Sequence, residues 1–247
     1  IVQKPSLGIA DTAPAMELLR VVKSMAEIKT VRHWSPDRLA RPTPAPNITT
    51  LRTIAQPIEI VAIGASTGGP QALFEILSRL PGDFATPVLV VQHISPGFAT
   101  TLVEWLKPLC PLPIQLATTG ISLDRPGIFV APSGYHLVVA RRRVLLTSAP
   151  PVGQHRPAAT LLFQSVAREY GRGAVGVLLS GMGDDGAIGL RDLKRAGGLT
   201  IGQDEASSVV FGMAAVAIGL GVVDSVLPPT KIAELLLHIG QFGREAG

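Results

Sequence analysis

The sequence is poor in the residues that several protein classes require. Cys110 is the one cysteine among 247 residues, which excludes an internal disulfide framework and a multi-cysteine metal site. Aromatic residues make up only 4% of the chain, so its core must be built from aliphatic side chains, as in buried parallel sheets. No apolar run approaches the roughly 20 residues that span a bilayer, and the N-terminus lacks a signal-peptide pattern. We therefore expect a globular, cytoplasmic protein without membrane insertion.

The charge pattern does not favour a nucleic-acid partner. The formal net charge is +4, but the basic residues are scattered along the chain. The one dense run, residues 141–143, lies between two alternating apolar segments. This position predicts a hairpin turn rather than a nucleic-acid-binding stripe.

The order of patterns divides the chain into three parts. Residues 1–30 have the pattern of one strand and one helix, a pair that cannot fold alone. Residues 31–57 are rich in proline and predict an extended linker. From residue 58 to residue 247, strand and helix patterns alternate, which predicts a doubly wound, mostly parallel sheet in a three-layer α/β/α fold. The middle section, residues 113–147, contains two short strand patterns and a hairpin, and we expect it to be antiparallel and peripheral.

A glycine-rich turn with one serine follows the first strand pattern of this last part. Residues 58–70 read IEIVAIGASTGGP, an apolar run that turns at Gly64 and enters a helix at Pro70. Gly64, Ser66 and Gly68 spell G-x-S-x-G, the turn that lifts a serine hydroxyl above a sheet. Three interpretations fit: a turn without chemistry, a phosphate-binding loop and a serine nucleophile. The phosphate loop is weaker than the turn without chemistry, because neither common glycine-rich phosphate motif is matched and no lysine follows the glycines.

A serine nucleophile needs a histidine base and a carboxylate, and both types follow later strand patterns. His93 comes directly after a buried run, and Asp185 lies in the glycine-rich turn after another. Because the carboxyl ends of parallel strands share one rim of a sheet, we expect both to meet Ser66 there.

Each of these two assignments has an alternative. His155, in a polar loop, is the rival to His93 as the base. The adjacent pair Asp184 and Asp185 could instead form a solvated turn that caps the next helix.

Six short motifs run in order through residues 58–247. They are GASTGGP (64–70), QHISPGF (92–98), APSGYH (131–136), HRP (155–157), GMGDDGA (181–187) and EASSVVFGMA (205–214). With these motifs the segment resembles the catalytic domain of chemotaxis protein-glutamate methylesterases. Residues 1–30 resemble the last strand and helix of a response-regulator receiver domain.

The resemblance implies hydrolysis of glutamyl methyl esters on cytoplasmic helices of chemoreceptors, with release of methanol, and deamidation of receptor glutamines. It implies Ser66 as nucleophile, His93 as base and Asp185 as the acid that orients the base. It also implies the backbone amides of Thr67 and Met182 as oxyanion donors, with no cofactor and no metal. Chemoreceptors are then the protein substrate, and a histidine kinase is the expected partner of the receiver domain.

Two other functions are compatible with the serine turn. One is a non-catalytic module that binds a phosphorylated ligand at the helix start near Gly68 and Gly69. The other is a domain that docks receptors or a kinase without chemistry. Ester hydrolysis that depends on Ser66 would separate the esterase from both. Ala158 stands where a serine often follows HRP in the family, which leaves substrate preference less defined than reaction type.

Overall fold

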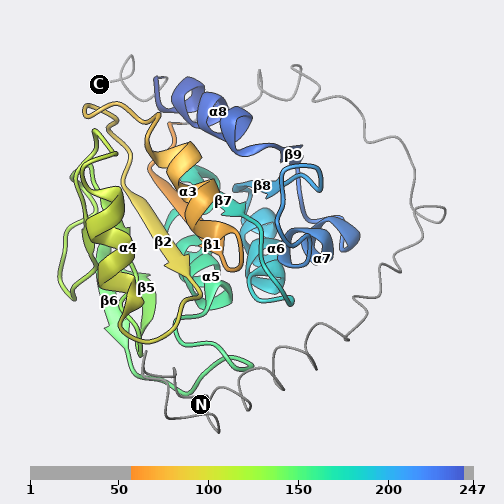
Figure 1. The fold of residues 1–247 in the computed structure, drawn as a ribbon, viewed down its shortest axis with the longest axis horizontal. Coiled ribbons are helices and arrows are strands. Elements are labelled where there is room, and N and C mark those ends of the chain that lie inside the picture. Colours follow the sequence, from red (N-terminus) through yellow and green to blue (C-terminus); the bar gives the residue numbers. More distant parts are fainter. Residues whose placement is uncertain (1–56, 242–247) are drawn as a thin grey trace, which may run out of the picture. The chain divides into compact units, whose positions relative to one another are not determined.

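A computed structural model describes residues 57–241 of the chain (Figure 1). The expected receiver remnant, residues 1–30, and all of the expected linker except Pro57 lie outside the described residues. Within residues 57–241, no helix combines the length and the apolar character that crossing a membrane requires.

The centre of the described part is a parallel sheet whose strands lie in the order β3, β4, β2, β1, β7, β8, β9. These strands are β1 (Ile60–Ala65), β2 (Val88–Gln92), β3 (Ile114–Leu116), β4 (Ile128–Val130), β7 (Ala174–Leu178), β8 (Leu199–Gln203) and β9 (Ser225–Leu227). Every neighbouring pair is parallel. The chain winds outward from β1 to one edge and then returns to β7, on the other side of β1. The doubly wound sheet that the alternating pattern predicts is therefore confirmed, with its topological switch point between β1 and β7.

Helices cover both faces of the sheet, which makes three layers (Figure 1). One face carries α3 (Gly69–Leu77), α4 (Phe98–Leu106) and α8 (Pro229–Gln241). The other carries α5 (Ala159–Tyr170), α6 (Ala187–Arg195), α7 (Met213–Gly219) and the two-stranded hairpin of β5 (His136–Ala140) and β6 (Arg143–Thr147). A short 3-10 helix, η2 (Gly171–Gly173), joins α5 to β7.

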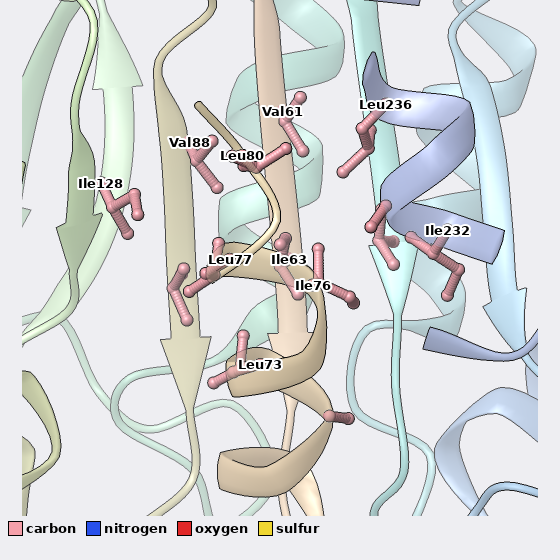
Figure 2. Close-up of a cluster of buried hydrophobic side chains, with 14 of the residues drawn as sticks. Val61, Ile63, Leu73, Ile76, Leu77, Leu80, Val88, Ile128, Ile232 and Leu236 are labelled. Atoms are coloured by element: carbon pink, nitrogen blue, oxygen red, sulfur yellow. The ribbon is translucent and has the colours of Figure 1, made fainter. Parts of the chain in front are cut away.

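The core is mostly aliphatic on both faces, as the low aromatic content predicts, with Phe84 on one face and Phe129, Phe163 and Tyr170 on the other as its buried aromatic residues. All six residues of β1 are buried, because their side chains alternate between the two helical layers. Figure 2 shows Val61 and Ile63 of β1 packed between α3 and α8, where they lie against Ile76 and Leu236. A fully buried side chain of this size contributes about 1.5–3 kcal/mol to stability. This packing fixes the strands whose carboxyl ends carry the candidate site.

The middle section differs from our expectation in one respect. The hairpin is antiparallel and peripheral as predicted, with Arg141 and Arg142 as its two turn residues. The strands β3 and β4, however, pair in parallel and belong to the main sheet, and β4 also pairs with β2. The expectation of an antiparallel arrangement for these two strands was wrong, because strands of three residues joined without a helix carry no pattern that distinguishes the two pairings.

Candidate active site

Ser66 lies at the carboxyl end of β1, immediately before the turn into α3. Its backbone N–H donates to the carbonyl of Ser180, and its own carbonyl accepts from the backbone N–H of Gly69, at 3.0 and 2.8 Å. The loop after β7 lies directly against it, since a Cβ added at Gly181 would be 2.6 Å from the Ser66 Cβ. Glycine at this position therefore allows the loop to approach the serine.

His93 follows β2, the strand beside β1. Its backbone N–H continues the sheet by donating to the carbonyl of Ala65 at 2.9 Å, so its position is set by the register of the two strands. The side chain is only 9% exposed, and its Nε2 lies 2.9 Å from Oδ2 of Asp185. Within residues 57–241 the buried Nδ1 has no polar partner, and Nε2 meets Asp185 at ion-pair distance without the geometry of a full hydrogen bond.

His155 packs face to face against His93. The two rings are parallel within 1°, with centroids 3.9 Å apart. Burial and the neighbouring His93 lower the pKa of His155, although Asp185 and Asp184 act in the opposite direction. A lowered pKa keeps His155 neutral at pH 7, so it does not repel a protonated His93. The rival histidine of the sequence thus lies beside His93 rather than in its place.

Asp185 lies in the turn after β7 and is buried, with 7% of its surface exposed. Its carboxylate accepts two backbone N–H groups at the start of α5, from Ala159 to Oδ2 at 2.7 Å and from Thr160 to Oδ1 at 3.0 Å. A helix start favours an anion, and Ala158 has no side chain that could cap this one.

The ionisation of Asp185 follows from these contacts. Burial by itself would raise the pKa of the carboxyl group. The interactions with His93, Thr160 and Ala159 outweigh burial and lower the pKa to about 2. A buried carboxylate is therefore ionised at neutral pH beside His93, where it can orient the ring and stabilise its cation. Asp184, by contrast, is exposed, so the two aspartates have different environments.

Two exposed turns supply free backbone donors near Ser66. Thr67 and Met182 are both exposed, and Met182 follows Gly181, which touches the serine. Within residues 57–241 neither backbone N–H has a hydrogen-bond partner. Each is therefore available to an anionic oxygen at this rim.

A cavity of about 360 Å³ opens beside the two stacked histidines. Its walls include His93, Ile94, Ser133, His155 and Pro157. A larger hollow of about 620 Å³ lies near the β3 edge and is lined by neither Ser66, His93 nor Asp185. Of these three residues only His93 lines the smaller cavity, and its place in the wall makes this cavity the candidate substrate site.

His136, the first residue of the hairpin, has a structural role. His136 is fully buried; its Nδ1 accepts from the backbone N–H of Ala158 at 3.2 Å, and its Nε2 lies 3.1 Å from the carbonyl of Pro150. Both ring nitrogens are thus used to hold the loop before α5. No group of His, Cys, Asp or Glu side chains within residues 57–241 has the arrangement of a metal site.

Comparisons with known proteins assign the chain and its fold to one family. Residues 61–236 match the family described as CheB methylesterase. The chain belongs to this family. A protein-glutamate methylesterase/protein-glutamine glutaminase of Syntrophus aciditrophicus is 43% identical over 243 residues, which cover 97% of this chain and 69% of that protein. A relative of the same description from Anaeromyxobacter dehalogenans is 45% identical over 240 residues, which cover 97% of this chain and 68% of the relative.

A solved structure agrees with this membership. The crystal structure of the CheB methylesterase catalytic domain of Thermotoga maritima superposes with a TM-score of 0.68 at 33% sequence identity, and the match covers 74% of this chain and all of that one. The family resemblance that the six motifs indicate is therefore confirmed for this CheB-family chain.

Sequence reasoning missed several groups that hold the rim together. In this CheB-family chain, Gln92 bonds the carbonyls of Ser66 and His93, and Ser180 Oγ donates to the carbonyl of Thr67 at 2.7 Å. A polar residue at the end of a buried strand was the one available signal. This signal does not show which backbone groups the polar side chain will bond.

Proposed function

We propose that Ser66, His93 and Asp185 form the catalytic triad by which this CheB-family hydrolase acts on glutamyl methyl esters and on glutamine side chains of chemoreceptors. The observation that carries the proposal is the short contact between His93 and the ionised Asp185 at the rim where Ser66 also lies. The names of the similar proteins support both the methylesterase and the glutaminase activities.

The free ring nitrogen of His93 defines the direction of proton transfer. Nε2 faces Asp185, so Nδ1 is the atom left to accept the Ser66 proton. In the serine-protease template the acid holds Nδ1 and the serine faces Nε2, so the two nitrogens exchange roles here. Asp185 then favours the tautomer with its proton on Nε2, which leaves Nδ1 basic.

The reaction proceeds in two halves on this arrangement. Ser66 Oγ attacks the ester carbonyl carbon while Nδ1 of His93 takes the hydroxyl proton, and the carbonyl oxygen becomes an oxyanion that accepts from Thr67 N–H and Met182 N–H. His93 returns the proton to the departing methoxy oxygen, methanol leaves, and a glutamyl ester of Ser66 remains. Water then attacks this ester with His93 again as base, which releases glutamate and restores Ser66. With a glutamine side chain, ammonia leaves in place of methanol.

Regulation and location belong to the same proposal. We infer that residues 1–30 are the end of a receiver domain that a histidine kinase phosphorylates, and that the protein works in the cytoplasm on receptor helices in chemotaxis adaptation. The lengths of the matched relatives are compatible with this inference, because each is longer than the part that this chain matches and so has room for a further domain.

The direct test is methanol release from a methylated chemoreceptor fragment. We expect Ser66→Ala to abolish release while the protein keeps its thermal unfolding transition. Ser78→Ala is the matched control, because Ser78 lies at the far end of α3 and bonds only the carbonyl of Phe74. Wild-type rates in Ser66→Ala would reject the triad. Binding of phosphorylated ligands without any turnover would favour the phosphate-binding alternative.

A further inference from the structure

Gln92 is a buried polar side chain that the mechanism above does not use. It ends β2, is 4% exposed and lies between the two residues proposed as nucleophile and base. Its Nε2 donates to the carbonyl of Ser66 and to the carbonyl of His93, both at 2.8 Å. Because both partners are carbonyl oxygens, which only accept, the amide nitrogen must be the atom that faces them.

The hydrogen bond from Gln92 to the Ser66 carbonyl fixes the orientation of the peptide group between Ser66 and Thr67. A trans peptide is planar, so its C=O and N–H point in opposite directions. The carbonyl of Ser66 is held on one side by Gln92 Nε2 and by the N–H of Gly69. The N–H of Thr67, in the same peptide, must therefore point away from Gln92, where it has no partner within residues 57–241.

The second free donor is oriented by the same kind of contact. The carbonyl of Gly181 accepts the backbone N–H of Met213 at 2.9 Å, which turns the N–H of Met182 to the opposite side of that peptide. One donor is therefore set by the first residue of α7, and the other by the side chain of Gln92 together with the backbone N–H of Gly69.

The side-chain amide of Gln92 lowers the stability of the fold at one of its two polar atoms. Among the described residues, its buried Oε1 has no hydrogen-bond partner, and a buried polar atom without one costs about 1–3 kcal/mol. The amide also requires space above Gly69, since a Cβ there would lie 2.1 Å from Oε1. A methionine would fill the same volume without a buried polar atom. An amide is therefore expected here for its two donated hydrogen bonds.

We propose that Gln92 is the positioning residue that aims the N–H of Thr67 at the oxyanion and holds the Ser66 and His93 loops at a fixed spacing. This inference rests on the proposed function, because an oxyanion forms only if Ser66 attacks an acyl group. Gln92 itself touches no reacting atom. Its effect should appear in the transition state and not in substrate binding.

The test compares Gln92→Met and Gln92→Asn in the full chain. Gln92→Met keeps the volume and removes both donors, whereas Gln92→Asn keeps an amide that is one methylene too short. Loss of one oxyanion donor lowers kcat by about 100- to 1,000-fold, so a misaimed donor should lower kcat by about 10- to 100-fold. We expect KM for the methylated receptor fragment to change less than about threefold, because the ground-state contacts remain.

A transition-state analogue provides a readout that a purely structural role would not change. A glutamyl boronic acid that forms a tetrahedral adduct with Ser66 should lose affinity by about the same factor as kcat. Thr200→Val is the matched control for the loss of buried hydrogen bonds. Thr200 is fully buried in β8 and bonds Val222 and Asp224, away from Ser66, so its loss should lower stability and leave kcat unchanged.

The outcomes separate this inference from the proposed function. A fall in kcat with a parallel fall in boronate affinity, in either folded variant, supports the inference. An active wild type, an inactive Ser66→Ala and Gln92 variants with normal kcat would overturn the inference alone. Methanol release that does not depend on Ser66 would overturn the proposed function and the inference with it.

Discussion

Replacement of Asp185 by asparagine should separate the two tasks that its carboxylate combines. The carboxylate accepts from Ala159 and Thr160 and faces His93, so every neighbouring group is a donor. Asparagine has nearly the same shape but one NH₂ group, which must then face one of these donors. The substitution therefore removes a charge and adds a mismatched contact without creating a cavity.

The magnitude follows from the lowered pKa of Asp185. Its pKa of about 2, against an ordinary value of 3.8, corresponds to about 2–3 kcal/mol of stability at neutral pH. We expect Asp185→Asn to lower the free energy of unfolding by about this amount. Replacing the acid of a triad by its amide lowers kcat by about 10,000-fold, and we expect a fall of that order in methanol release.

The stabilisation that Asp185 provides should decrease as the pH falls. Below pH 4 the carboxyl group of the unfolded chain takes up a proton, whereas the folded one resists protonation until about pH 2. The stabilisation by Asp185 is thus complete above pH 4 and lost as the pH falls from 4 to 2. The difference in unfolding free energy between wild type and Asp185→Asn should narrow over this window.

Urea unfolding at several pH values and the initial rate of methanol release are the two assays. Asp184→Asn is the matched control, because Asp184 is the exposed neighbour and should change neither quantity by more than about 0.5 kcal/mol or twofold. Wild-type activity of Asp185→Asn would refute its role in orienting His93. An equally large loss of stability at pH 2 and pH 7 would refute the electrostatic explanation.

Three further predictions concern other parts of the molecule. His155→Ala should lower kcat by about tenfold and His155→Phe by less, because a flat ring at 3.9 Å restrains the plane of His93; equal losses, measured by methanol release, would contradict this role. Arg141→Gly should raise the free energy of unfolding in urea by about 0.5–1 kcal/mol, since Arg141 has a φ of 52° in the hairpin turn; destabilisation would show that its side chain outweighs this strain. Cys110 should react with iodoacetamide much more slowly in the native protein than in urea, because burial raises its pKa to about 11; equal rates would contradict its burial.

The sequence predicted the parts of the site that follow from local pattern. A short buried apolar run that stops at a glycine-rich turn or a polar residue predicts a strand end, and Ser66, His93 and Asp185 all follow such runs. The parallel sheet then brings those ends together. Their environment depends on contacts between distant segments. Asp185 bonds the start of α5, where Ala158 has no side chain that could cap the helix, and no pattern near residue 185 indicates this contact.

The position of His155 beside His93 could not be predicted for a related reason. Residues 148–157 have no periodicity, so the stacking of His155 on His93 depends on the path of the whole loop. The role of Gln92 was likewise hidden, because the carbonyls that it bonds become its neighbours only when β1 and β2 pair in register. Local pattern thus indicates which residues reach the rim, and tertiary structure determines what each of them contacts there.

Covalent labelling of the serine is the most direct measurement of the central claim. The full chain is incubated at pH 7 with a fluorophosphonate, which reacts with activated serine hydroxyls, and the modified peptide is identified by mass spectrometry. We expect one adduct, on Ser66, whose amount rises in proportion to the loss of methanol release, and much slower labelling in His93→Ala. Loss of activity with Ser66 unmodified, or labelling of Ser66 at the same rate without His93, would contradict the claim.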